Sequence, residues 1–303
     1  MERHRLTAYI ELLVAISIWG IGASVIKFAL GSLPPFIFLS YRFLFTSIIL
    51  LPFFLAEKSK GINRKNIWML LLIAFLGSTL NLGLYFYGTK LSTSIDASLI
   101  TSTAPILIIL AGAIFLKEHV THSEKIGIGI TLLGTFVIML QSFFEPGGVP
   151  KTAVLGNILL FGCNVAFAAY LILSKEVLKD RISAFTLTFA TFLVGFVTTL
   201  PLTLFETKPA NLMPIILHLN LPTQASVIYM AVLSGALAYF LYQKAQKTIE
   251  ASEASVFQYL QPLATAPIAV AWLGEKITIP MVMGSFLVGI GVFLAEWKKK
   301  RYN

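Results

Sequence analysis

Residues 105–127 read PILIILAGAIFLKEHVTHSEKIG, and residues 262–284 read PLATAPIAVAWLGEKITIPMVMG. Each segment begins with Pro and ends with Gly, and the two share Leu, Glu and Thr at the same internal positions. They belong to a longer match, because a shift of 157 residues aligns 78–140 with 235–297 without a gap. Of the 63 aligned pairs, 13 are identical, so we interpret the match as an internal repeat and not as a chance likeness between apolar segments.

The composition indicates a membrane protein. Of the 303 residues, 57% are hydrophobic and only 12% are charged, and the mean hydropathy is +0.83. A soluble domain carries about 25% charged residues. A soluble enzyme and a disordered chain are therefore excluded. The formal charge of +9 comes from Lys and Arg residues scattered between apolar segments, which argues against a nucleic-acid-binding face.

Ten apolar segments are each long enough to cross a hydrocarbon core of about 30 Å as a helix. They lie at residues 8–29, 36–56, 67–89, 94–116, 123–142, 153–174, 183–205, 224–246, 251–273 and 279–297. The predicted fold class is an all-α integral membrane protein with ten transmembrane helices.

The ten segments divide into two repeats of five. The first repeat covers residues 8–142 and the second covers residues 153–297; their early spans match more loosely at a shift near 149, where Pro52 meets Pro201. Because five is an odd number, the second repeat must enter the membrane in the opposite orientation. Inverted repeats are typical of secondary transporters, whose substrate binds near the middle of the bilayer between the halves.

The Lys and Arg residues predict the orientation of the chain. Seventeen of them lie on one side of a ten-span topology and five on the other, with Arg42 left inside a span. Positively charged loops favour the cytoplasm, so we expect both termini to be cytoplasmic. The expected localisation is the inner or plasma membrane of the cell, with multiple spans.

The doubled pattern P…L-x-E…T…G resembles the two copies of the EamA domain in the drug/metabolite transporter superfamily. Ala97 and Ala254, eight residues before each Pro, fit that domain, as does Arg42 in the segment Y-R-F. Lys117 departs from the pattern, since the second copy has the more typical Gly274. The resemblance covers essentially the whole chain and implies the export of a small metabolite by alternating access, with an amino acid as the expected substrate. A multidrug or sugar permease of the same fold and a non-transporting membrane protein are the alternatives.

No arrangement of residues typical of an enzyme is found in the sequence. Asp96 and Asp180 are the only aspartates and are predicted on opposite faces of the membrane, and Cys163 is the single cysteine. No Walker-type nucleotide motif occurs. We therefore expect no enzymatic activity, no cofactor and no metal. The expected partners are a small-molecule substrate and the lipid bilayer, without nucleic acid, and the chain is expected to be monomeric.

Polar and aromatic side chains near the middle of the spans are predicted to bind the substrate. A polar group is costly in lipid and tends to face a cavity or another helix. The predicted substrate-binding residues are Trp19, Asn81, Thr101, Asn164, Tyr239, Gln258 and Gln261. Close packing between helices is the alternative explanation for the hydroxyl and aromatic members of this group.

Equivalent positions of the two repeats are predicted to act together. The predicted gate residues are Tyr85, Ser98, Tyr242 and Ser255. Pro105 and Pro262 are predicted to bend their helices, because each proline lacks a backbone donor and frees an upstream carbonyl group.

Two charged residues within the spans leave alternatives open. Arg42 has a structural role, either by reaching the outer interface or by pairing with Asp96, or it binds a substrate carboxylate through its guanidinium group. Glu11 either couples protons through a raised pKa or is a solvated group at the interface.

Overall fold

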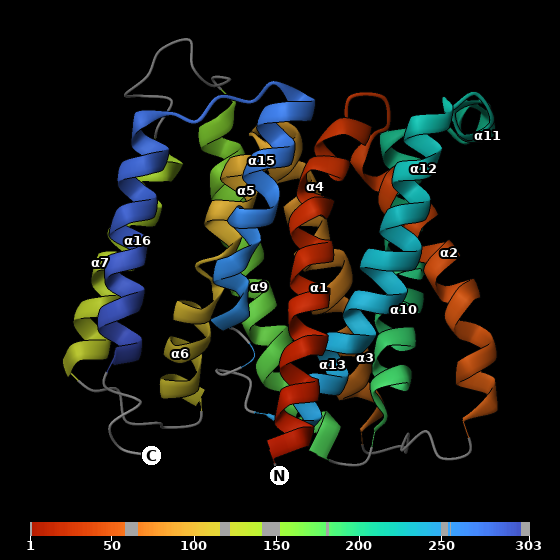
Figure 1. Ribbon diagram of the computed structural model, residues 1–303. Helices are drawn as coiled ribbons and strands as arrows, with labels where there is room; N and C mark the ends of the chain where they lie inside the picture. The colour runs from red at the N-terminus through yellow and green to blue at the C-terminus, as the bar shows by residue number, and fades with distance from the viewer. Residues whose placement is uncertain are drawn as a thin grey trace.

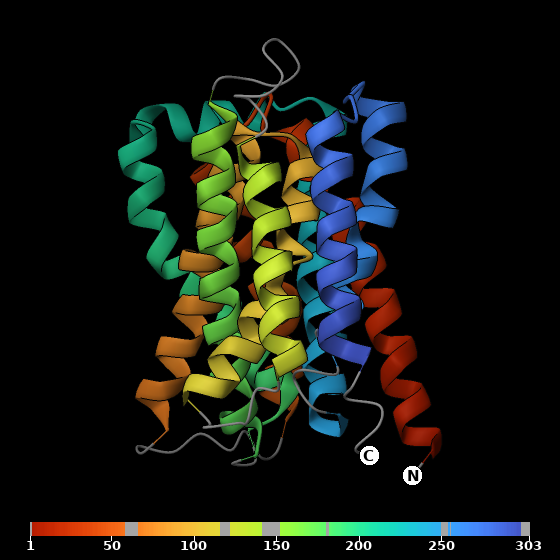
Figure 2. The ribbon, with the colours of Figure 1, turned by 90° about the vertical axis from the view of Figure 1, so that its left-hand side faces the viewer.

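The computed structural model describes residues 2–57, 66–115, 122–140, 152–179, 182–249, 254 and 256–297. In this part of the chain all regular secondary structure is helical, and the helices form one bundle (Figure 1, Figure 2). The first half contains α1 (Glu2–Ala29), α2 (Pro35–Ala56), α3 (Ile67–Phe75), η1 (Leu76–Leu80), α4 (Asn81–Leu91), α5 (Ser94–Thr101), α6 (Ala104–Phe115) and α7 (His122–Met139). The second half contains α9 (Ala153–Lys179), α10 (Ala184–Glu206), α11 (Pro209–Leu217), α12 (Leu221–Tyr229), η2 (Met230–Ala238), α13 (Tyr239–Thr248), η3 (Val256–Leu260), α15 (Gln261–Leu273) and α16 (Ile279–Trp297).

The bundle has the dimensions and composition of a membrane domain. Among the described residues, seven helical stretches are long and apolar enough to cross a bilayer, and shorter apolar helices lie at Lys125–Met139 and Ile279–Leu294. The predicted all-α membrane class is therefore confirmed, whereas the count of ten transmembrane helices stays a prediction. The start of α1 and the end of α16 lie at the same end of the bundle (Figure 1).

The predicted segments coincide with the observed helices to within a few residues at most ends, with three differences. The helix α1 begins at Glu2, before the predicted start at residue 8. The helix α9 continues to Lys179, beyond the predicted end at residue 174. The short helix α11 was predicted as a loop. It begins with Pro209 at its first position, and Leu212, Ile215 and Ile216 pack on the core with one side of the helix.

Equivalent helices of the two halves pack against each other in opposite directions. Glu57, at the end of α2, accepts hydrogen bonds from the hydroxyl groups of Ser183 and Thr186 at the start of α10 (2.6 and 2.9 Å). Glu206, at the end of α10, accepts one from the backbone N–H of Phe36 in the first turn of α2 (2.8 Å). The two glutamates are 149 positions apart in the sequence, which is the offset between the early spans of the repeats. Each helix therefore begins where its counterpart ends.

The helices α7 and α16 cross at glycines. A Cβ atom added to Gly134 would lie 2.6 Å from the carbonyl oxygen of Gly284, and one added to Gly284 would lie 2.7 Å from that of Gly134. Further along the crossing, a Cβ atom added to Gly291 would lie 2.6 Å from the carbonyl oxygen of Gly127. Because low numbers on α7 meet high numbers on α16, this pair is also antiparallel. These glycines form two of the identical pairs in the sequence match.

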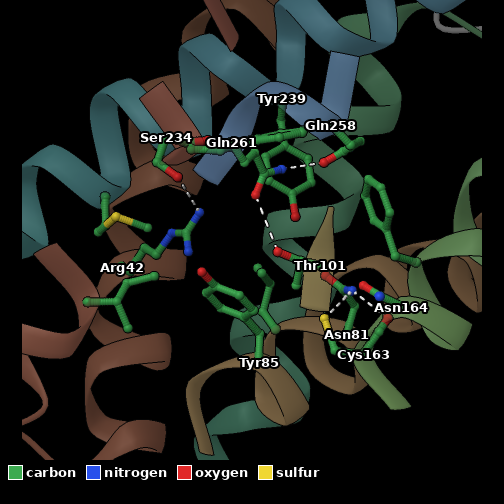
Figure 3. Close-up of a pocket in the computed structure, with 15 residues that line it drawn as sticks. Arg42, Asn81, Tyr85, Thr101, Cys163, Asn164, Ser234, Tyr239, Gln258 and Gln261 are labelled. Atoms are coloured by element: carbon green, nitrogen blue, oxygen red, sulfur yellow. Dashed lines mark hydrogen bonds between the residues drawn. The ribbon is translucent and has the colours of Figure 1, made fainter. Parts of the chain in front are cut away.

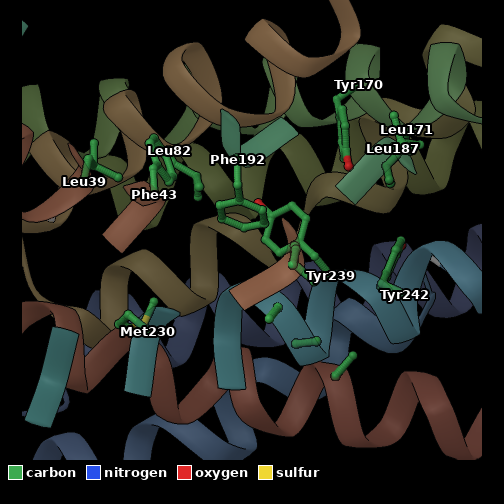
Figure 4. Close-up of a cluster of buried hydrophobic side chains, with 14 of the residues drawn as sticks. Leu39, Phe43, Leu82, Tyr170, Leu171, Leu187, Phe192, Met230, Tyr239 and Tyr242 are labelled. Carbon is green, nitrogen blue, oxygen red and sulfur yellow. The ribbon is translucent and has the colours of Figure 1, made fainter. Parts of the chain in front are cut away.

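The apolar core lies where the two halves meet (Figure 4). The ring of Phe192 on α10 packs edge-on against Phe43 of α2 and Tyr239 of α13, with ring centroids 5.6 and 5.1 Å apart. Edge-to-face pairs of this kind add about 0.5–1.5 kcal/mol to the burial of the rings. The contacts fix one half of the molecule on the other around the site described next.

Four helices are irregular at corresponding positions of the two halves. The π-helical segment η1 falls, after the shift of 157 residues, inside the π-helical segment η2. The helix α5 ends at Thr101 and α6 starts at Ala104, just before Pro105, while the 3₁₀ segment η3 gives way to α15 just before Pro262. Each break frees backbone carbonyl groups, and π segments are frequent at functional sites.

Candidate substrate-binding site

A cavity of about 570 Å³, its opening included, lies inside the bundle and is walled by both halves (Figure 3). All the predicted substrate-binding residues line it: Trp19, Asn81, Thr101, Asn164, Tyr239, Gln258 and Gln261. The structure thus brings together side chains from both repeats, and their role in binding stays a prediction.

Two asparagines join the helices that form one wall. The Nδ2 atom of Asn81 donates to the carbonyl oxygen and the Sγ atom of Cys163 on α9, at 3.0 and 3.2 Å. The Nδ2 atom of Asn164 donates to the carbonyl oxygen of Ile100 (2.6 Å) and to the hydroxyl group of Thr103 (3.2 Å). The break between α5 and α6 makes that carbonyl group accessible. Both amides therefore hold α9 against the first half while lining the cavity.

A chain of side-chain hydrogen bonds crosses to the second half. The hydroxyl group of Thr101 donates to Oε1 of Gln261 at 3.3 Å, and Nε2 of Gln261 donates to Oε1 of Gln258. Thr101 and Gln258 are equivalent positions under the shift of 157 residues. The two irregular spans thus meet through polar side chains at the cavity.

Trp19 forms an aromatic wall with the second half. Its Nε1 atom donates to the backbone carbonyl oxygen of Ser234 in η2 at 3.1 Å. The centroid of its ring lies 5.1 Å from the ring centroid of Tyr239 and 5.2 Å from that of Tyr242. The π segment η2 therefore anchors the indole, and α13, which follows it, supplies the two tyrosine rings.

The predicted gate residues occupy different places. Tyr85 lines the cavity, and Tyr242 is buried behind Trp19. Ser98 is fully buried, and its hydroxyl group donates to the carbonyl oxygen of Ile95 (2.8 Å) within its own helix. Ser255 lies outside the described residues. These positions belong to one conformation, so the role of the four residues in gating stays a prediction.

Arg42 lies on the cavity wall and is only 1% exposed, and the choice between its predicted structural role and its predicted role in binding a carboxylate stays open. Its Nη2 atom donates to the hydroxyl oxygen of Ser234 at 3.2 Å, and its Cζ atom lies 5.9 and 5.8 Å from the ring centroids of Phe86 and Phe192. Asp96 instead accepts a hydrogen bond from Ser92 (2.7 Å). The aromatic faces stabilise a guanidinium group away from the interface.

The sequence reasoning missed two lysines that cap helix ends. The Nζ atom of Lys27 donates to carbonyl groups at the end of α4, among them that of Thr89 (2.9 Å). The Nζ atom of Lys175 donates to the carbonyl groups of Gln246 and Ile249 at the end of α13, each at 2.5 Å. The lysines are 148 positions apart, and α4 and α13 are equivalent helices. In the sequence, both lysines stand at the end of an apolar run. That position indicated a loop and gave no sign that the lysines cap other helices.

The two ends of the bundle also carry contacts between the halves. The carboxylate of Glu275, in the connection between α15 and α16, accepts from the backbone N–H groups of Ser94 and Ile95 at the start of α5 (2.7 and 3.0 Å). At the other end, Glu11 forms an ion pair with Lys244 (2.6 Å), which favours the interfacial alternative for Glu11. Within the described chain, no three His, Cys, Asp or Glu side chains are grouped to hold a metal ion.

Comparison with known proteins identifies the family. The model of the EamA-like transporter family matches residues 6–140 and 154–297. The uncharacterized transporter YetK of Bacillus subtilis is 27% identical over 99% of this chain and 90% of its own. An uncharacterized transporter of Archaeoglobus fulgidus is 28% identical over 96% of this chain and 99% of its own. A crystal structure with 18% sequence identity superposes with a TM-score of 0.68 and covers 99% of both chains, which shows a shared fold. The chain is therefore a membrane transporter that belongs to the EamA-like transporter family.

Proposed function

We propose that the protein is a secondary transporter that moves a small organic metabolite, an amino acid, outward across the cell membrane by alternating access. Both termini lie in the cytoplasm in this proposal. The observation that carries it is the cavity between two halves whose equivalent helices, α2 with α10 and α7 with α16, run antiparallel.

The antiparallel arrangement gives the proposal its mechanism. If each half adopts the conformation of the other, the contacts at one end of the bundle break while equivalent contacts form at the other end. Glu57 and Glu206 hold both ends of the pair α2 and α10, and Lys27 and Lys175 each cap a helix of their own half, so these equivalent contacts support the symmetry of the two halves. A cavity in the middle would then open to each side in turn.

The chemistry of the wall supports a small amphipathic solute. Aromatic rings of Trp19 and Tyr239 provide an apolar surface, and the amides of Asn81, Gln258 and Gln261 provide donors and acceptors. An amino acid offers both kinds of group in one small molecule. No nucleotide motif occurs in the chain, so the free energy for transport would come from gradients.

Counterflow in proteoliposomes tests the proposal. Vesicles loaded with an unlabelled amino acid should accumulate the labelled form transiently, and vesicles without protein should not. A panel of amino acids, sugars and cationic drugs identifies the substrate class. Counterflow of none of these solutes, or uptake that does not saturate, would contradict the proposal.

A further inference from the structure

The cavity carries a single formal charge. Among the described residues that line it, Arg42 is the one ionised side chain, and no Asp or Glu accompanies it. The guanidinium group is buried, and its Nε and Nη1 atoms have no hydrogen-bond partner among the described residues. Only Nη2 is used, by the hydroxyl group of Ser234 (3.2 Å). Figure 3 shows the group directed into the space between Ser234 and Tyr85.

A buried cation without a counterion is costly, and the surroundings of Arg42 compensate for it only in part. The rings of Phe86 and Phe192 lie just under 6 Å from Cζ and hold the side chain in place through cation–π attraction. Neither ring neutralises the charge. A neutral side chain could fill the same space without the desolvation cost of an ion. The two unsatisfied nitrogens therefore indicate a missing partner that accepts hydrogen bonds and is negatively charged.

The partner is expected to carry one anionic group. A carboxylate matches one guanidinium group, whereas a doubly charged phosphate would leave a net negative charge buried in the cavity. The second half offers no further cation at the equivalent place, because the residue 149 positions after Arg42 is Thr191. Beyond the charge, the rings of Trp19 and Tyr239 suit an apolar substituent.

We propose that Arg42 is the anion-binding subsite of this cavity and that the substrates are small carboxylates with an apolar part. The proposal rests on the transport function proposed above and narrows it. Monoanions and amino-acid zwitterions qualify, since amide and hydroxyl oxygens can accept from an ammonium group. Organic cations without a carboxylate are excluded, because they would meet the uncompensated charge of Arg42.

Fluorescence quenching of Trp19 tests the subsite without a known substrate. Substitution of Trp68, Trp272 and Trp297 by Phe leaves Trp19 as the single indole, and it lines the same cavity as Arg42. The detergent-solubilised protein is titrated with iodide, an anion, and separately with neutral acrylamide at constant ionic strength. The same titrations are made after Arg42→Gln, which removes the charge, and after Arg42→Lys, which keeps it.

We expect Arg42→Gln to lower iodide quenching about fivefold or more, since a nearby unscreened charge changes the local anion concentration by at least that factor. Acrylamide quenching should remain unchanged, which shows that the cavity is intact. Arg42→Lys should retain most of the iodide quenching. Equal iodide quenching in the wild type and in Arg42→Gln would overturn the proposal.

The carboxylate is tested by protection against iodide. We expect 4-methylpentanoate and phenylacetate to protect Trp19, whereas their primary amides, 4-methylpentanamide and phenylacetamide, should not. In Arg42→Gln, the acid concentration that gives half-maximal protection should rise about tenfold or more. This factor is the effect of losing a charge-assisted hydrogen bond. If neither acid protects, or the amides protect equally well, the carboxylate assignment is wrong.

The readout separates this proposal from the proposed transport. An Arg42-dependent iodide effect in a protein that shows no counterflow would contradict transport and leave the anion subsite standing. Counterflow of a neutral sugar or an organic cation that is insensitive to Arg42→Gln would contradict the anion subsite and leave the proposed transport standing.

Discussion

Replacement of Glu275 by Gln should loosen one end of the bundle. The carboxylate of Glu275 belongs to the second half and accepts two backbone N–H groups at the start of α5 in the first half, at 2.7 and 3.0 Å. A hydrogen bond to a charged group contributes about 1.5–3 kcal/mol. The substitution Glu275→Gln keeps one acceptor oxygen and removes the charge. Because the side chain is only half-buried, we expect a loss of about 1–2 kcal/mol, or about 5- to 30-fold in the population of the closed form.

The assay measures the opening of that end. Ser98 lies one turn into α5 and is fully buried, so a cysteine there reacts with a maleimide only when the end opens. In a Cys163→Ala background, which removes the only native thiol, the labelling rate of Ser98→Cys should rise by the same factor of about 5 to 30 after Glu275→Gln. Lys276→Gln changes an exposed neighbour and should leave the rate unchanged. An unchanged rate after Glu275→Gln, or an equal rise after Lys276→Gln, would refute the reasoning.

Three further predictions concern the cavity, the packing and the orientation. Asn81→Leu and Gln258→Leu should each raise the substrate concentration needed for half-maximal counterflow about tenfold, because each removes polar contacts of the wall. Unchanged concentrations in both variants would contradict the assignment of these residues to the substrate cavity. Gly284→Leu should destabilise the crossing of α7 and α16 by about 1–3 kcal/mol, seen as a lower Tm, whereas Gly289→Leu, with open space around its Cβ position, should not. A reporter enzyme that is active only in the cytoplasm should function when fused after Asn303, and activity of a periplasm-only reporter there would reverse the topology.

The sequence could predict the helical membrane fold because the signals involved are long and repeated. Spans of about 20 apolar residues are required by the thickness of the bilayer, whatever the tertiary contacts. The glycine and proline pairs of the repeat also correspond to physical features: Gly134 and Gly284 meet at a helix crossing, and Pro105 and Pro262 each follow a break in a span. The short helix α11 escaped prediction because it has only nine residues, includes Pro209 and Pro214, and packs on the core with one side only.

The cavity was within reach of sequence reasoning because polar residues in the middle of spans must face the protein interior. The environment of Arg42 was not, since depth along a helix does not give the face that a side chain occupies. Leu39 and Thr46, three residues before it and four after it, are both buried and mark the inward face of α2. Contacts such as those of Glu275 with α5 could not be predicted, because they join segments 180 residues apart.

Alternating access is the central claim, and the most direct measurement compares Ser98→Cys with Ser255→Cys. These equivalent positions of the two repeats are predicted near opposite mouths of the transporter. In the Cys163→Ala background, each cysteine is labelled from its own side with an impermeant maleimide, with and without the transported substrate. The account predicts that substrate raises the labelling rate at one position and lowers it at the other. Changes in the same direction at both positions, or rates that do not respond to substrate, would contradict it.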